Sequence, residues 1–391
     1  MGVLSGLLPT EYSQIASKFW PVFSPLDNWR RWRNRLLSNS HFQKKATSLP
    51  LVRTIAHHKA RRLFDLCSGF VYSQILLACI RLQLFHFLAE EPKSLSQCCK
   101  KFNLPEDSLE RLLEAAASLN LLNKCKDGRY CLGSYGAALL ANRGIEQMIE
   151  HNALLYEDLK DPILFLKNPT QKTALSRYWA YARAKDPSKL SEQEIKNYSA
   201  LMSASQPLVA EQILDAYPFT EHKHLLDVGG GEGLFLCEVG RRFPHLSLTL
   251  FDLPAVAKQA KKNFIKNKLS SRTTTLGGNF FADPLPEKKD LITLIRILHD
   301  HSDDKVLQLL HNIHKVLPKN GRLLIGEPLA ETRGAEPMGA AYFGFYLLAM
   351  RSGRPRTKSE LQKMLKKVGF RESYALPTRI PLQTSLLVAI P

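Results

Sequence analysis

The sequence predicts an α/β protein with a doubly wound, mostly parallel sheet in its C-terminal part and a helical winged-helix domain before it. The sheet is predicted by short apolar runs that alternate with helical patterns from Leu214 to the end of the chain. A glycine-rich turn directly after one of these runs indicates where such a sheet binds its ligand. The winged helix is predicted by three helical patterns followed by two short strand patterns around Asp127-Gly128.

His224–Gly233, which reads HLLDVGGGEG, is the most informative stretch of the chain. Its apolar first half predicts a buried strand, and its glycines predict a tight turn into a helix. Gly229, Gly231 and Gly233 lie two residues apart, whereas a pyrophosphate-binding turn has the spacing G-x-G-x-x-G. Asp227 before the turn would repel phosphate, but it suits a cationic amino-acid group such as the ammonium of S-adenosylmethionine. A plain strand-to-helix turn is the alternative.

A second acidic residue supports a cofactor site. Asp252 ends the next apolar run, Leu246–Phe251. It lies about 20 residues past the glycines, where doubly wound folds place the acceptor for ribose hydroxyls. The glycines and the two acids together predict that the chain binds S-adenosylmethionine.

The remaining strands of the predicted sheet follow in order along the chain. Each is a short apolar run bounded by turn residues or by a helical pattern. The predicted strands are Leu225–Val228, Leu246–Phe251, Thr273–Leu276, Leu291–Leu298 and Arg322–Gly326, with Pro381–Ile390 as an added edge strand.

The winged-helix region begins with a strongly apolar helical stretch, Arg61–Glu90, which predicts a core helix or a subunit interface. Ser94–Phe102 and Glu106–Leu121 follow as helices, and Leu122–Lys126 with Tyr130–Leu132 form a hairpin. In a DNA-binding winged helix, Glu106–Leu121 would be the recognition helix, but its acidic side chains would repel phosphate. We therefore expect no nucleic-acid partner, and a role in dimerisation or in covering the substrate instead.

Composition and pattern divide the chain into four regions. Its 391 residues suffice for two or three domains, and 45% hydrophobic with 23% charged residues is typical of a globular protein. The predicted regions are a basic N-terminal extension (1–60), a winged-helix dimerisation domain (61–140), a helical substrate-lining segment (141–213) and a cofactor-binding domain (214–391).

Cysteine usage and hydropathy indicate where the protein works. Seven cysteines occur without a C-x-x-C pair, which favours reduced thiols over a disulfide framework or a zinc site. The N-terminus lacks the charged start and clean apolar core of a signal peptide. No run reaches the roughly 18 apolar residues of a transmembrane helix. We expect a cytoplasmic protein that does not cross a membrane.

The net charge of +18 is concentrated at the N-terminus. Residues 1–62 hold eleven Lys or Arg against two acidic residues, and they also contain three of the four tryptophans. Basic and aromatic residues together are typical of segments that bind nucleic acid or an anionic membrane surface. We expect peripheral contact with an anionic membrane at its inner face, with a purely solvated arm as the alternative.

Two candidate catalytic residues lie at the carboxyl ends of predicted strands. His299 follows the fourth strand and Glu327 ends the fifth. A histidine in this place can act as a general base, with its imidazole oriented by the glutamate. A packed or helix-capping histidine is the alternative. A metal site with His301 is disfavoured, because two histidines at i and i+2 on a turning loop point apart and no cysteine completes the set.

The motifs DVGGGEG, FDLP, GGNFF, ILHDHSDD and LLIGEP occur in this order between Asp227 and Pro328. In this arrangement the chain resembles small-molecule O-methyltransferases of the plant caffeate and hydroxyindole type. Those enzymes join a winged-helix dimerisation domain to a Rossmann-like class I methyltransferase sheet, so the resemblance implies a homodimer that uses S-adenosylmethionine. Further stretches, such as AEPMGAAYFGFYLLAMRSGRPRT, resemble the bacterial branch that methylates acyclic carotenoids. The resemblance covers roughly residues 35–391.

The resemblance also assigns roles to residues. It makes His299 the general base and Glu327 its partner. Where plant enzymes carry a second glutamate, this chain has Pro355, which implies a less strongly oriented base, and the aromatic residue after His-Asp is His301 rather than Trp. The residues that match the cofactor-binding motifs are Asp227, Gly229, Gly231 and Gly233 in the loop, Asp252 for the ribose, and Asn279 with Phe280 on the adenine side.

The resemblance implies an enzyme that transfers a methyl group to a hydroxyl of an acyclic hydroxylated carotenoid, a lipophilic small molecule. A tertiary alcohol is much less acidic than a phenol, so proton removal would accompany methyl transfer and positioning would supply most of the rate. The aromatic run Tyr342–Tyr346 would line the site of a polyene or simply pack in the core. The alternatives are a phenolic or polyketide acceptor and, outside enzymes, a methyltransferase-fold regulator or a DNA-binding winged helix.

Overall fold

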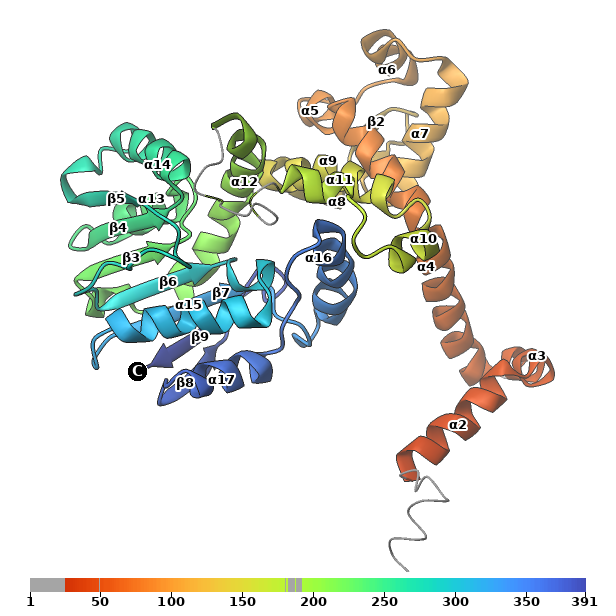
Figure 1. The fold of residues 1–391 in the computed structure, drawn as a ribbon. Helices are drawn as coiled ribbons and strands as arrows, with labels where there is room; N and C mark the ends of the chain where they lie inside the picture. Colours follow the sequence, from red (N-terminus) through yellow and green to blue (C-terminus); the bar gives the residue numbers. More distant parts are fainter. Residues whose placement is uncertain (1–24, 49, 180, 182–186, 188–191) are drawn as a thin grey trace, which may run out of the picture. The chain divides into compact units, whose positions relative to one another are not determined.

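The computed structural model describes residues 25–48, 50–179, 181, 187 and 192–391. The chain divides into two compact units, Met1–Gln74 and Ile75–Pro391. Expectations that concern Trp20 and the charges before residue 25 lie outside the described residues. Figure 1 shows the described elements, coloured along the chain from α2 to β9.

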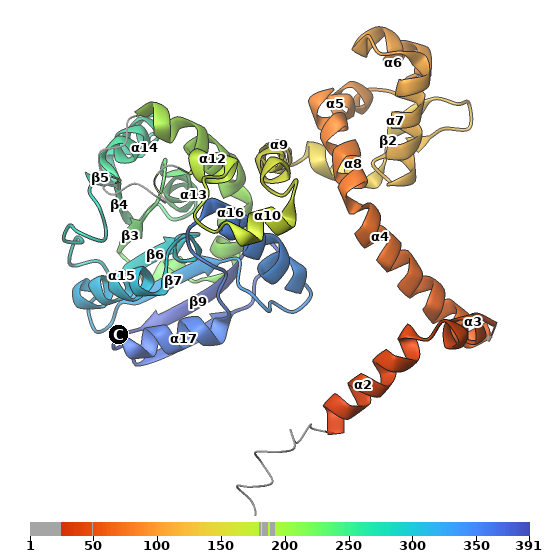
Figure 2. The ribbon, with the colours of Figure 1, turned by 45° about the vertical axis from the view of Figure 1, so that its right-hand side comes forward.

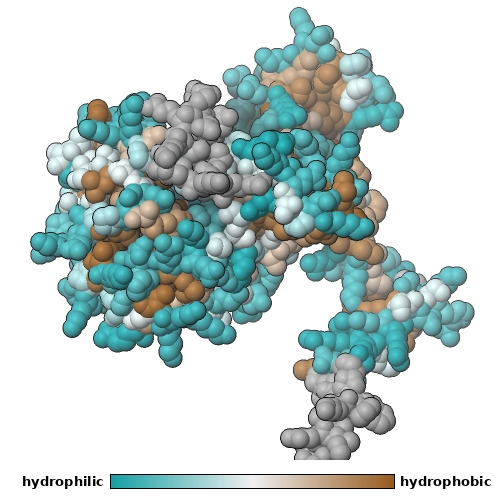
Figure 3. Space-filling view, in the orientation of Figure 1, coloured by the Kyte–Doolittle hydropathy of each residue, from teal (hydrophilic) through white to brown (hydrophobic). Residues whose placement is uncertain are grey.

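The described part of the first unit is helical. It contains α2 (Pro25–Ser38), α3 (Ser40–Ser48) and most of α4 (Pro50–Arg81). On α2, Trp29 and Trp32 are exposed among exposed arginines, and the Arg33 guanidinium lies over the Trp29 ring. Figure 3 shows hydrophilic side chains in this part of the chain with hydrophobic ones between them. Helix α2 thus presents two tryptophans and several arginines to solvent, and further lysines and arginines of this region lie on α3 and α4.

Helix α4 carries large apolar side chains on its surface. Leu63, Phe64, Leu66 and Phe70 are each more than half exposed. By length and composition, its segment Val52–Arg81 is long and apolar enough to cross a membrane, and only 11% of its most apolar window is buried. This corrects the expectation that no run is long enough, although a core helix meets the same criteria.

The second unit begins with the end of α4 and a small helical domain. The prediction of one helix over Arg61–Glu90 is wrong near its end, because Gln83 adopts left-handed backbone angles (φ 53°) between α4 and α5 (Leu84–Ala89). Helix α6 (Leu95–Phe102) starts with a capping box, in which Ser94 and Gln97 each accept the other's backbone N–H.

The rest of this small domain follows the predicted winged-helix order. Helix α7 (Glu106–Ser118) buries Leu109, Leu113 and Ala116 along one face, which is the helical spacing seen in the sequence. Strands β1 (Leu122–Lys124) and β2 (Tyr130–Leu132) then pair antiparallel as the expected hairpin.

Helices lead from the hairpin to the main sheet. The longest of them, α12 (Glu192–Ala216), packs against α9 (Arg143–Asp158) and against α13 (Leu234–Arg242), the first helix of the sheet domain. These helices are α8 (Ser134–Leu140), α9 (Arg143–Asp158), α10 (Pro162–Lys167), α11 (Ala174–Tyr178) and α12 (Glu192–Ala216).

Seven of the described strands form the main sheet, in the order β5-β4-β3-β6-β7-β9-β8. The chain enters at β3 in the interior of the sheet and winds outward in both directions, so the predicted doubly wound fold is confirmed. The strands are β3 (His224–Val228), β4 (Ser247–Asp252), β5 (Thr273–Gly277), β6 (Leu291–Ile295), β7 (Arg322–Glu327), β8 (Glu372–Leu376) and β9 (Ser385–Ile390).

Helices cover both faces of this sheet (Figures 1 and 2). One core contains side chains of α12, α13 (Leu234–Arg242) and α14 (Pro254–Lys266) against one face. The other contains side chains of α15 (Asp303–Val316) and α17 (Lys358–Lys367) against the opposite face. Strand β6 is buried along its whole length, because a central parallel strand is covered on both sides.

Two strand predictions need correction. The predicted strand Leu291–Leu298 ends at Ile295, since Arg296 has left-handed backbone angles (φ 60°) that stop the extended chain. The last strand, β9, is an interior strand paired antiparallel to both β7 and β8. The edge position belongs to β8, whose mixed sequence ESYAL gave no clear strand signal.

Candidate active site

A cavity of about 660 Å³ opens at the carboxyl ends of β3, β4 and β6. This is where doubly wound sheets bind ligands, at the point where the strand order reverses. Its wall contains six of the residues predicted for the cofactor: Asp227, Gly229, Gly231, Asp252, Asn279 and Phe280.

Asp227, at the end of β3, is buried and forms no ion pair with any of the residues that the structure describes. Its Oδ1 accepts a hydrogen bond of 2.6 Å from the Thr293 hydroxyl, whereas its Oδ2 has no hydrogen-bond partner within the described part of the chain. Burial raises the pKa of this carboxyl to about 7. A buried carboxylate oxygen without a partner fits a cationic ligand, and S-adenosylmethionine carries both an ammonium and a sulfonium.

The three glycines of the turn are needed for different reasons. A Cβ at Gly229 would lie 2.4 Å from Ile297, and one at Gly233 would lie 2.6 Å from Phe264, so both allow close packing. Gly231 has left-handed backbone angles (φ +59°), and a Cβ there would meet no protein atom within 4 Å. A side chain at Gly231 would therefore project into the open space of the cavity.

Asp252, at the end of β4, is held by the same turn. Its Oδ2 accepts the backbone N–H of Gly231 at 2.8 Å, and its Oδ1 accepts that of Leu253 at 2.7 Å. Burial raises the pKa of Asp252 to about 6 despite these two bonds. A carboxylate fixed in this way at the second strand fits a ribose diol.

Asn279 and Phe280 follow β5 (Thr273–Gly277) and also line the cavity. The Asn279 side-chain oxygen accepts a hydrogen bond of 3.0 Å from the Phe281 backbone N–H. The side-chain NH₂ group of Asn279 can then donate to a ligand. The Phe280 ring packs edge-on against Phe281 and lies 5.8 Å from the His301 ring. This aromatic and polar pair fits a purine ring.

His299 and Glu327 are in direct contact, as predicted. The His299 Nδ1 pairs with one carboxylate oxygen of Glu327, and the other oxygen accepts the backbone N–H groups of Ile297 (2.9 Å) and Leu298 (2.6 Å). Burial of the imidazole disfavours its charged form, but the carboxylates of Glu327 and Asp300 outweigh this effect and raise the pKa of His299 to about 9. The histidine is therefore charged at neutral pH.

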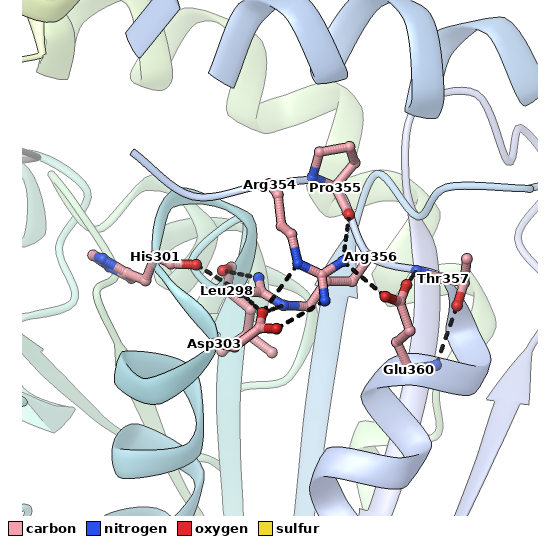
Figure 4. A network of polar contacts seen from close by, with 8 residues as sticks. All are labelled: Leu298, His301, Asp303, Arg354, Pro355, Arg356, Thr357 and Glu360. Carbon is pink, nitrogen blue, oxygen red and sulfur yellow. Dashed lines mark hydrogen bonds and ion pairs between the residues drawn. The ribbon is translucent and has the colours of Figure 1, made fainter. Parts of the chain in front are cut away.

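The loop that carries His299 is fastened by Arg356 (Figure 4). The buried Arg356 guanidinium donates hydrogen bonds of 2.7 Å to the backbone oxygens of Leu298 and His301, and it pairs with Asp303 at 2.7 Å. Arg356 belongs to the segment in which plant enzymes would carry a second glutamate. This segment reads GRPRT, with Pro355 at the position that the resemblance assigns to that glutamate, so it supplies backbone support but no carboxylate to the histidine.

Arg296 is a site residue that sequence reasoning missed. It lines the cavity and donates a hydrogen bond of 2.8 Å to the Ser205 hydroxyl and another to Gln206, both on α12. Burial lowers the pKa of Arg296 to about 10, so it stays charged at neutral pH. A cation within the apolar run LITLIRIL was the available signal. Its charge suits the carboxylate of an amino-acid ligand.

We predict that Gly231→Val abolishes binding of S-adenosylmethionine and that Asp252→Ala weakens it by ~1.5–3 kcal/mol for each hydrogen bond to the charged oxygen. Gly128→Val is a matched control, because Gly128 also has positive φ (+80°) and open space but lies in the β1–β2 turn. Calorimetry measures all three affinities. Unchanged binding in the Gly231 and Asp252 variants would contradict the assignment of the cavity.

Comparison with known proteins identifies the family. Residues 156–371 match an O-methyltransferase domain and residues 64–143 an O-methyltransferase dimerisation domain. Demethylspheroidene O-methyltransferase of Cereibacter sphaeroides is 39% identical over 91% of this chain and 93% of its own length. The Rhodobacter capsulatus protein of the same name is 40% identical over 87% of this chain and 84% of its own length.

Solved structures agree on the fold. Human N-acetylserotonin methyltransferase, in complex with S-adenosylmethionine, has a TM-score of 0.70 at 24% identity, covering 85% of this chain and 97% of that one. CalO1, a methyltransferase in calicheamicin biosynthesis, has a TM-score of 0.71 at 23% identity, covering 85% and 98%. With the cavity and its two buried carboxylates, these matches show that the chain belongs to the S-adenosylmethionine-dependent O-methyltransferases that carry an N-terminal dimerisation domain.

Proposed function

We propose that this O-methyltransferase acts on a hydroxyl of an acyclic hydroxylated carotenoid. The observation that carries the proposal is the 39–40% identity, over most of both chains, to two demethylspheroidene O-methyltransferases. The phenazine O-methyltransferase of Lysobacter antibioticus, named for an aromatic compound, is less similar, at 26% identity. A phenolic or polyketide acceptor is therefore the weaker candidate.

S-adenosylmethionine supplies a methyl group on a positively charged sulfur. We assign its charged amino-acid part to Asp227 and Arg296, its ribose hydroxyls to Asp252 and its adenine to Asn279 and Phe280. The support is the sign of each charge: an unpartnered carboxylate oxygen and a buried guanidinium line the same cavity. The Gly231 backbone completes this site without a side chain.

His299 and Glu327 are the proposed catalytic pair that assists removal of the hydroxyl proton. Their direct contact and the burial of Glu327, whose side chain is 3% exposed, support this role. The His299 side chain is largely buried, and the centroid of the Phe343 ring lies 5.9 Å from that of the His299 ring. Exclusion of water strengthens the electrostatic interactions of such a pair.

Apolar residues of α12 and α16 (Gly344–Met350) would receive the hydrocarbon part of the acceptor. Met202, Leu347 and Leu348 line the cavity. In the predicted aromatic run, Tyr346 is a core residue whose hydroxyl accepts a hydrogen bond of 2.7 Å from the Trp179 indole. Tyr346 thus supports the wall from behind, with Trp179 as the residue that faces the cavity.

The assembly we propose is a homodimer. The dimerisation-domain match begins at residue 64, within the segment of α4 that exposes Phe64, Leu66 and Phe70. Such a row of exposed large apolar side chains is typical of a subunit interface. A second copy of the chain would remove this surface from water.

We further propose that the basic N-terminal helices contact an anionic membrane. A carotenoid resides in the lipid bilayer, and the enzyme must collect it there. Arg30, Arg31 and Arg33 are exposed beside the exposed Trp29 and Trp32. Cations near an anionic surface contribute about 1 kcal/mol each, and interfacial Trp adds to this binding.

Incubation of the purified protein with S-adenosylmethionine carrying a labelled methyl group tests the proposed function. We predict a labelled methyl ether from a hydroxylated acyclic carotenoid and none from phenols, detected by mass. His299→Ala should lower turnover ~10²–10⁴-fold with cofactor affinity nearly unchanged. His311→Ala, at an exposed position on α15, is the control. Labelling of a phenol alone would contradict the carotenoid assignment.

Cosedimentation with liposomes tests the membrane contact. We predict binding to anionic liposomes, little binding to neutral ones, and release by salt. Replacing Arg30, Arg31 and Arg33 by Ala should weaken binding by roughly 100-fold, at about 1 kcal/mol per charge. Removing three exposed lysines of α17 instead, Lys363, Lys366 and Lys367, should have a much smaller effect. Equal loss in both triple variants would show that only total charge matters.

A further inference from the structure

Three buried residues form a hydrogen-bonded chain that runs from the cavity wall into the core. The Trp179 indole N–H donates a hydrogen bond of 2.7 Å to the Tyr346 hydroxyl, which lies 2.7 Å from the His151 Nε2. All three residues are less than a tenth exposed. Trp179 lines the cavity, whereas Tyr346 and His151 are not among the described residues of its wall. The indole N–H therefore points away from the cavity, toward Tyr346.

The chemistry of the three groups fixes the direction of each hydrogen bond. An indole N–H only donates, so the Tyr346 oxygen accepts it. Tyr346 forms no other hydrogen bond with the described residues, so its own hydrogen points to the His151 Nε2. A hydrogen on that Nε2 would leave the buried Tyr346 hydrogen without an acceptor. His151 is therefore a neutral imidazole that carries its hydrogen on Nδ1.

A second aromatic side chain of the same wall also uses its donor within the protein. The Tyr181 ring lines the cavity and lies edge-on to the Trp179 ring, with centroids 5.8 Å apart. Its hydroxyl donates a hydrogen bond of 2.5 Å to the Asp300 carboxylate. The two neighbouring rings therefore have no hydrogen left to donate to a ligand in the cavity.

Ring packing holds the indole in this position. The Tyr178 and His151 rings lie edge-on to the Trp179 ring, at centroid distances of 5.3 and 5.9 Å. Together with the hydrogen bond to Tyr346, these contacts fix both the place and the direction of the indole. An aromatic ring whose N–H is already bonded behaves toward a ligand as an apolar surface.

We propose that Trp179 determines acceptor specificity and that Tyr346, anchored by His151, is the positioning residue that keeps the indole N–H out of the cavity. This proposal rests on the proposed O-methylation and adds a selection rule to it. The wall admits a hydrocarbon chain beside the reacting hydroxyl and disfavours a second polar group there. Such a group would lose its hydrogen bonds to water and would find no donor in the two rings.

Matched acceptors test this rule in the unmodified enzyme. We expect kcat/KM to be ~10–100-fold higher for a monohydroxylated acyclic carotenoid than for its analogue with a second hydroxyl on the adjacent carbon. If the enzyme methylates phenols instead, the carotenoid assignment fails, and phenol with catechol gives the same comparison. Equal kcat/KM for the two members of a pair would overturn the proposal and leave the proposed O-methylation intact.

Tyr346→Phe removes the hydroxyl that receives the indole N–H. We expect the kcat/KM ratio of the two acceptors to fall ~10-fold, mainly through a higher KM for the apolar one, because the freed N–H can turn toward the cavity. Tyr342→Phe is the matched control, since it removes a hydroxyl four residues earlier that donates a hydrogen bond of 2.9 Å to Asn152. The control should leave the ratio unchanged. General damage to packing lowers kcat/KM for both acceptors alike, so an unchanged ratio in Tyr346→Phe would overturn the proposal.

A double variant separates the indole N–H from the hydroxyl. In Trp179→Phe the N–H is absent, so the further change Tyr346→Phe should alter the ratio by no more than ~2-fold, and the two substitutions should be strongly non-additive. A full ~10-fold loss on the Trp179→Phe background would show that Tyr346 acts by another route, and it would overturn the positioning role.

Trp179 fluorescence tests the position of the ring without turnover. Replacing Trp20, Trp29 and Trp32 by Phe leaves Trp179 as the only tryptophan of the chain. We expect acrylamide to quench its emission more strongly when Tyr346→Phe is added than when Tyr342→Phe is added. Equal quenching in both would contradict the positioning role. Absence of methyl transfer to any hydroxyl would instead refute the proposed function.

Discussion

Two buried carboxylates, Asp227 and Asp252, define the chemistry of this protein, and neither forms an ion pair within the described part of the chain. Burial of a charged group is unfavourable unless a partner compensates it. Here the parallel sheet places both acids at the ends of adjacent strands, and the glycine turn gives one of them only a backbone N–H. In the free protein a bound proton compensates part of this charge, as the raised pKa values of both carboxyls indicate. A cationic, ribose-bearing cofactor takes over this compensation when it binds.

Charged groups of both signs also lie between the cofactor site and the catalytic residues. The Arg296 guanidinium, the His299 imidazolium and the Glu327 carboxylate lie at the ends of β6 and β7. Each depends on its neighbours, because Glu327 organises the backbone of the His299 loop and also pairs with the ring. Arg356, which does not line the cavity among the described residues, donates a hydrogen bond to the backbone of the same loop. The site thus consists of charged groups that hold one another in place at the carboxyl ends of the strands.

The sequence was sufficient where local pattern and tertiary structure agree. The apolar run and glycine turn at His224–Gly233 predict strand, turn and helix, and the cavity indeed lies there. The match of ILHD and LLIGEP to family motifs likewise predicts the contact of His299 with Glu327, which the structure contains.

The sequence was insufficient where long-range contacts decide. Nothing local to LITLIRIL says that the strand stops at Ile295, because Glu327 from β7 accepts the N–H groups that follow. The interior position of β9 depends on its pairing with β8, which is a weak strand by its own sequence. Arg296 gains its place in the site only from hydrogen bonds to α12, and Asp300 only from its contacts with Tyr181 and His299.

The proton balance of cofactor binding tests the central claim most directly. Calorimetry of S-adenosylmethionine binding between pH 5 and 7, in buffers of different ionisation enthalpy, counts the protons released. Because burial raises the pKa of Asp227 to about 7 and of Asp252 to about 6, a cationic ligand should lower both values. We predict proton release on binding and an affinity that rises with pH over this range. Binding without proton release, at an affinity independent of pH, would contradict the account.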